Sequence, residues 1–210
     1  MARPILMLLA IASFAGAGLA QVVHAPYAHA SDAIDQNRAD TFDKNMFMHP
    51  PGDKASACFM RRYDADHMAR HPKQKVAAMK LLVAAEIAEG ETRLSYSFHL
   101  GVNLRRRGSD FESSGYCDHA TAEDNGREIR FACGVDCENG GINVALSKDS
   151  SSAIVRLEQI VLWKNNKPDP DGDVVLAGRE DKIFRLDRVD AQECAALAGD
   201  SGELAALPER

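Results

Sequence analysis

Residues 94–104 read Leu-Ser-Tyr-Ser-Phe-His-Leu-Gly-Val-Asn-Leu, a run in which apolar residues alternate with polar or small ones without interruption. Successive side chains of a β-strand point to opposite faces, so this alternation is typical of a strand with one buried face. Phe98, at the centre of the run, is expected to face the core, and Ser97 is expected on the opposite side. The stretch therefore predicts a half-buried strand.

Shorter runs of the same kind follow along the chain. They lie at residues 129–133, 142–146, 154–163, 174–177 and 184–186, with turns rich in Gly, Asn and Asp between them. Consecutive strands with short turns, each with one apolar face, must close around a core. We therefore expect a mainly β fold, an antiparallel meander of about six to eight strands closing as a barrel or sandwich, with short helices near the N- and C-terminal ends.

One segment, residues 76–88, allows two interpretations. It is rich in Ala, Met, Lys and Glu, which favour a helix by intrinsic propensity. Its apolar side chains also alternate, however, and it leads through Glu89-Gly90-Glu91 directly into residues 94–104. We predict a strand that forms a hairpin with residues 94–104.

Three short helices are expected outside the strand region. The first covers residues 32–44, with Ser31 as its N-cap, because Ser side chains accept from the free N–H groups of a first turn. The second covers residues 64–70 and ends before Pro72, which cannot continue a helix. The third covers residues 190–197.

The first twenty residues have the layout of a secretory signal peptide. Arg3 provides a positive start, residues 5–14 are apolar, and Gly18 and Ala20 form a small-x-small cleavage site. The apolar run is shorter than the roughly 20 residues that span a bilayer. We predict that residues 1–20 are removed and that the protein is periplasmic or secreted; a second small-x-small site at residues 28–30 is an alternative.

The remainder is expected to contain three parts. Residues 21–55 form an extended or partly helical arm, residues 56–198 a single β-rich domain, and residues 199–210 a flexible tail. The formal net charge of −6 and the isolation of the basic run at residues 105–107 argue against nucleic acid as a partner. No segment after the signal is apolar enough for a transmembrane helix.

The five cysteines follow the predicted signal peptide, so an oxidising compartment makes disulfides the expected use. If residues 124–126 form a three-residue turn, Cys117 lies directly opposite Cys133, close enough to bridge. A two-residue turn at residues 125–126 would instead place Asp118 opposite Cys133. We predict the first register and a Cys117–Cys133 disulfide, because two buried free thiols are the rarer outcome in such a compartment.

Cys58 and Cys194 flank the strand region. The two ends of a closed domain commonly lie near each other, so a Cys58–Cys194 disulfide is the second predicted bridge. Cys137 is then the unpaired thiol.

Three stretches resemble a family of uncharacterised exported proteobacterial proteins. They are YDADHMARHP at residues 63–72, CGVDCENGG at residues 133–141 and IFRLDR at residues 183–188. That family has no assigned activity, so the resemblance implies an exported protein and nothing about mechanism.

Asp64, His67 and His71 are candidates for metal ligands. The two histidines are four residues apart and share a helix face, and Asp64 precedes them by three residues. Two imidazoles and a carboxylate suit zinc or copper. The alternative is structural, with the histidines bonded to the backbone or placed at the helix end.

Other motifs have simpler interpretations. Residues 169–173 resemble the start of a calcium loop, but Val174 stands where an EF-hand needs Gly, so an acidic turn is favoured. Residues 199–202 match the nucleophile loop of chymotrypsin-like proteases, but Glu203 replaces the next Gly. The pair Cys133 and Cys137 has one residue too many between its members for a thioredoxin-type motif.

No pattern in the sequence identifies a catalytic group or a cofactor. We expect a non-catalytic binding or envelope-accessory protein whose partner is an unknown small molecule or an envelope protein. A periplasmic zinc or copper protein, or an enzyme without a recognisable motif, are the alternatives.

Overall fold

The computed structural model describes residues 34–105, 110–122, 128–135, 140–164, 173–176, 178 and 180–198. Several predicted features lie outside these residues: the signal peptide at 1–20, the turn at 124–126, Cys137, the acidic segment at 169–172 and the tail at 199–210.

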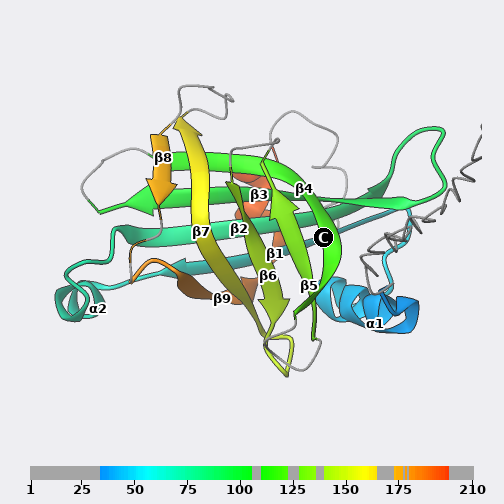
Figure 1. Cartoon of the computed structure of the whole chain (residues 1–210), viewed down its shortest axis with the longest axis horizontal. Helices are drawn as coiled ribbons and strands as arrows, with labels where there is room; N and C mark the ends of the chain where they lie inside the picture. Colours follow the sequence, from blue (N-terminus) through cyan, green and yellow to red (C-terminus); the bar gives the residue numbers. More distant parts are fainter. Residues whose placement is uncertain are drawn as a thin grey trace, which may run out of the picture. The chain divides into compact units, whose positions relative to one another are not determined.

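The described residues form nine strands and three short helices (Figure 1). In chain order these are α1 (Gln36–Phe47), β1 (Lys54–Arg62), α2 (Ala65–Arg70), β2 (Val76–Ile87), β3 (Leu94–Leu104), β4 (Asp110–Ala122), β5 (Glu128–Gly134), β6 (Gly140–Leu146), β7 (Ser152–Lys164), β8 (Asp173–Leu176), β9 (Ile183–Val189) and the 3-10 helix η2 (Ala191–Leu197).

The strands pair antiparallel in one sheet that closes on itself. The order is β6-β5-β4-β3-β2-β1-β9-β7-β8, and a further pairing of β6 with β7 completes a ring. The first part of β7 pairs with β9 and β6, whereas residues 159–162 pair with β8. The predicted β fold, an antiparallel meander that closes around a core, is confirmed.

The ambiguous segment is a strand, as predicted. β2 pairs with β3 from Ile87 opposite Leu94 to Val76 opposite Leu104. Leu81 and Val83 are fully buried on the inner face, and η2 covers Leu82 on the outer face. Pairing on both edges and burial on both faces therefore outweigh the helix propensity of this segment.

Large apolar side chains fill the inside of the ring. Phe98 is fully buried, as expected from the alternation, whereas Ser97 is only partly buried. Four other phenylalanines are at most 1% exposed and belong to the same core: Phe59, Phe111, Phe131 and Phe184.

The two disulfides of the structure are the predicted pairs. Cys117 lies opposite Cys133 in the β4–β5 ladder, so the three-residue-turn register holds, and their sulfurs are bonded at 2.02 Å. Cys58 is bonded to Cys194 and fastens η2 to the outer face of β1. Gly101 leaves room for this helix, because a Cβ there would lie 2.9 Å from the side chain of Leu197.

The helices occur close to the predicted positions, with one correction. α1 is capped by Asp35, whose carboxylate accepts from the N–H groups of Asn37 and Arg38, so the expected N-cap Ser31 and the range 32–44 are wrong. A carboxylate is also favoured at the positive end of the helix dipole. The helix continues to Phe47, because its last turn is buried in the core.

Candidate functional site

α1 packs against one end of the ring (Figure 1). Phe42, Met46 and Phe47 on one face of the helix are buried in the core. The ring of Phe42 meets the ring of Phe131 edge to face, with centroids 4.9 Å apart. These contacts bury apolar area, which is sufficient reason for the helix to dock there.

Arg188 on β9 fastens the last turn of α1. Its guanidinium donates to the carbonyl oxygens of Met46, at 2.8 Å, and of Asn45, at 3.0 Å. It also lies over the ring of Phe59, 4.5 Å from the centroid. Burial lowers the pKa of Arg188, but an arginine starts so high that its charge remains at neutral pH. A cation here stabilises the negative end of the helix dipole.

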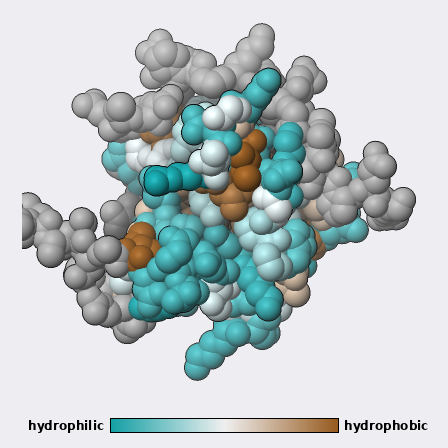
Figure 2. Space-filling view, turned by 90° about the vertical axis from the view of Figure 1, so that its right-hand side faces the viewer, coloured by the Kyte–Doolittle hydropathy of each residue, from teal (hydrophilic) through white to brown (hydrophobic). Residues whose placement is uncertain are grey.

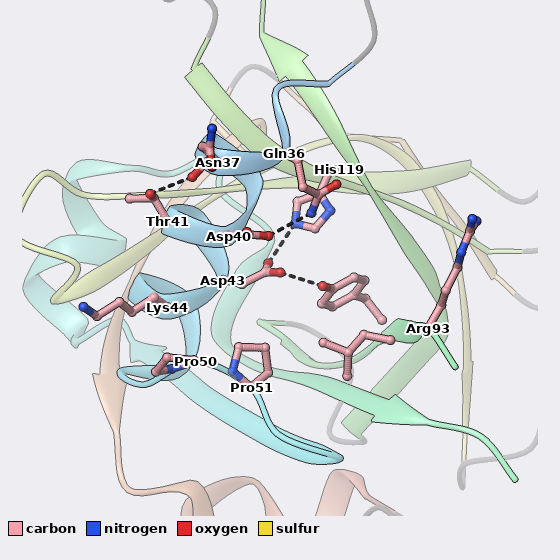
Figure 3. Close-up of a pocket in the computed structure, with 12 residues that line it drawn as sticks. Gln36, Asn37, Asp40, Thr41, Asp43, Lys44, Pro50, Pro51, Arg93 and His119 are labelled. Atoms are coloured by element: carbon pink, nitrogen blue, oxygen red, sulfur yellow. Dashed lines mark hydrogen bonds and ion pairs between the residues drawn. The ribbon is translucent and has the colours of Figure 1, made fainter. Parts of the chain in front are cut away.

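Asp43 places a carboxylate on the buried face of α1, where it is 4% exposed. The hydroxyl of Tyr96 on β3 donates to one carboxylate oxygen at 2.5 Å, and Nε2 of His119 on β4 lies 2.7 Å from the other (Figure 3). Burial and the bond to Asp43 raise the pKa of Tyr96 far above its ordinary value, so the phenol keeps its proton. A buried carboxylate thus holds two donors from two strands.

This network fixes where the protons lie. A carboxylate can only accept, so Nε2 of His119 carries the proton in its bond to Asp43. Three rings pack around His119 and hold its orientation, with centroids at 4.9 Å for Phe131, 5.0 Å for Tyr96 and 6.0 Å for Phe42.

The network forms part of the wall of an open cleft of about 1020 Å³ beside α1. Its other walls come from the start of β3 and the segment after α1. The lining residues are Gln36, Asn37, Asp40, Thr41, Asp43, Lys44, Pro50, Pro51, Arg93, Leu94, Tyr96 and His119. Figure 2 views the molecule from the side on which α1 lies in Figure 1, and the coloured surface there is mostly hydrophilic.

The charged groups at the rim of the cleft differ in the hydrogen bonds and salt bridges that they form within the protein. Asp40 accepts from the amide of Gln36 at 2.8 Å. Lys44 and Arg93 are exposed, and neither forms a salt bridge with any residue that the structure describes. The rim therefore carries one carboxylate and two cations.

Of the three candidate metal ligands, His67 lies on α2, and Asp64 and His71 are its N-cap and C-cap. α2 lies at the other end of the ring from α1 (Figure 1). Asp64 caps α2 by accepting from the backbone N–H of His67 at 2.7 Å. Nε2 of His67 lies 2.9 Å from the amide oxygen of Gln74, and its ring is stacked between those of Tyr63 and His71. Within the described ranges, no three His, Cys, Asp or Glu side chains gather to hold a metal ion.

Sequence reasoning did not find Asp43, Tyr96 or His119. One signal was present: the buried face of α1 has the spacing 39, 42, 43, 46, 47, and Asp43 is the one acid in that apolar stripe. Its partners lie 53 and 76 residues further along the chain, which no local pattern could connect.

No protein-family model matches the chain, and no curated protein or solved structure is significantly similar to it. These comparisons assign no family. Among the described residues, no helix is long and apolar enough to span a membrane. The site must therefore be interpreted from its own geometry.

Proposed function

We propose that this is an exported, non-catalytic binding protein of the cell envelope, and that it holds a small polar molecule in the cleft beside α1. The observation that carries this proposal is the buried Asp43 network on the cleft wall. Burying a carboxylate is costly, and apolar contacts already dock α1. The network is thus more than helix docking requires, as expected for polar groups that orient a ligand.

The location of the cleft agrees with the rest of the fold. We take the closed ring to be a small β-barrel, whose interior is filled by phenylalanine and aliphatic side chains. A ligand would then bind at the mouth of the barrel, in the cleft between α1 and the end of the β2–β3 hairpin. Pockets for small molecules commonly have volumes of roughly 300–1,000 Å³, so this one is spacious.

Export is supported by two kinds of observation. The N-terminal layout is that of a signal peptide, and four cysteines are paired in disulfides, which persist in oxidising compartments. The resemblance to exported proteobacterial proteins agrees with this and stays a prediction.

The test is a ligand screen read by NMR on the disulfide-bonded protein. A library of sugars, amino acids, organic acids and amines is added, and backbone amide shifts are followed. We expect hits that move the amides of residues 36–44, 93–96 and 119. A library without hits, or hits confined to another surface, would contradict the proposal.

Two tryptophan variants on α1 provide a matched comparison. Asn37 and Asn45 are both exposed, but Asn37 lines the cleft, whereas Asn45 lines a separate, adjoining groove that Ile129 and Leu146 also line. Asn37→Trp should block the hits, and Asn45→Trp should leave them unchanged. Equal loss in both variants would mean that the effect comes from disturbing α1 and not from filling the cleft.

A further inference from the structure

The inner wall of the cleft presents hydrogen-bond acceptors. The proton of Tyr96 is donated to Asp43, so its oxygen has only lone pairs left for a ligand. The Nε2 proton of His119 is engaged in the same way, so this nitrogen offers no donor to a ligand. A group that binds at this wall must therefore donate.

The rim of the cleft presents donors. Arg93 and Lys44 carry N–H groups that form no salt bridge within the described part of the chain. The amide of Asn37 adds a donor and an acceptor, and it too lines the cleft. A group that binds beside these two cations must mainly accept.

Hydroxyl groups meet both requirements, because each donates one hydrogen bond and accepts others. A carboxylate or phosphate would suit the rim but not the acceptors of the wall, and an ammonium would suit the wall but not the cations of the rim. The cleft is also balanced in formal charge, with Asp40 and Asp43 against Lys44 and Arg93. Nothing in it therefore selects a ligand with net charge.

The geometry points to a saccharide as the ligand of the cleft, an inference that rests on the proposed binding function. Leu94, Pro50 and Pro51 add apolar surface between the polar groups, and the C–H faces of a sugar ring can pack on such surface. The volume of about 1020 Å³ leaves room for more than one sugar unit. The expected ligand is a neutral oligosaccharide.

The experiment measures affinity for four panels under identical conditions: neutral di- and trisaccharides built on glucose, galactose, mannose or N-acetylglucosamine; amino acids; dicarboxylic acids; and polyamines. We expect binding from the saccharides, with amide shifts at residues 93–96 and 119. Binding in the cleft by amino acids, dicarboxylates or polyamines in place of sugars would overturn the inference and leave the proposed function standing. Absence of binding in all panels would overturn both.

Two further readouts test the polarity of the wall. Tyr96→Phe keeps the ring but removes the hydroxyl, so saccharide affinity should fall about tenfold, the value of one hydrogen bond. Tyr116→Phe, at an exposed tyrosine outside the cleft, should change nothing. If Tyr96→Phe folds poorly, the affinity of the wild-type protein for mono-O-methyl derivatives of the bound sugar is measured instead. At least one methyl ether, which can accept but not donate, must bind about tenfold more weakly; equal affinity of all derivatives contradicts an accepting wall.

Discussion

Replacing Asp43 by alanine should destabilise the protein severely, because it leaves two donors on the wall of the cleft without their acceptor. Tyr96 and His119 lie 2.5 and 2.7 Å from the carboxylate, and Asp43 itself is 4% exposed. Leaving a buried donor unpaired costs about 1–3 kcal/mol. Because both donors reach the cleft, and water can replace part of each bond, we expect a total loss of about 3 kcal/mol in the free energy of unfolding.

The assay is equilibrium unfolding in urea, with disulfides intact, followed by circular dichroism. Asp40→Ala is the matched control, since Asp40 lies on the same helix but is exposed and bonds only to Gln36 among the described residues. We expect a loss below about 0.5 kcal/mol for this control. If Asp43→Ala costs no more than Asp40→Ala, Tyr96 and His119 do not depend on Asp43 as their acceptor, and the reasoning is refuted.

Three other predictions concern the stability of the fold. Arg188→Lys should lose about 1–2 kcal/mol of unfolding free energy in urea, because an ammonium cannot reach both carbonyls of α1 at once; a loss near zero would contradict the anchor. Removing the Cys58–Cys194 bridge with paired alanines, across 136 residues, should cost about 4–5 kcal/mol in the same assay, and an unchanged midpoint would show that η2 holds without it. The pKa of Tyr96 is raised in the fold above its ordinary 10.0, so the unfolded chain loses this proton first as the pH rises. The free energy of unfolding should therefore fall above about pH 10, and it should fall by less in Tyr96→Phe. Identical pH profiles for the two proteins would be the contrary result.

The strands and the Cys117–Cys133 disulfide could be predicted from sequence because their signals are local. Alternation over 94–104 fixed both the strand and the inward side of Phe98. The Cys117–Cys133 pair followed from counting back along two strands from one turn. In each case a periodicity or a short loop determines the geometry, and no distant contact is needed.

The cleft could not be predicted, because it depends on how distant segments meet. Residues 21–55 were predicted to form an extended or partly helical arm. Their sequence contains no signal that indicates where α1 packs on the sheet. Asp43 was detectable as an acid among apolar neighbours, but its partners on β3 and β4 become neighbours only when the sheet is formed. The spacing of His67 and His71 suggested metal ligands, whereas in the structure their rings stack on each other.

The central claim, that the cleft beside α1 holds a small molecule, is tested most directly by calorimetric titration of the best ligand from the screen into three proteins: wild type, Asn37→Trp and Asn45→Trp. The account predicts one binding site in the wild type, affinity at least about tenfold weaker when tryptophan fills the cleft at position 37, and unchanged affinity when it lies at position 45. Undiminished binding by Asn37→Trp would contradict the claim.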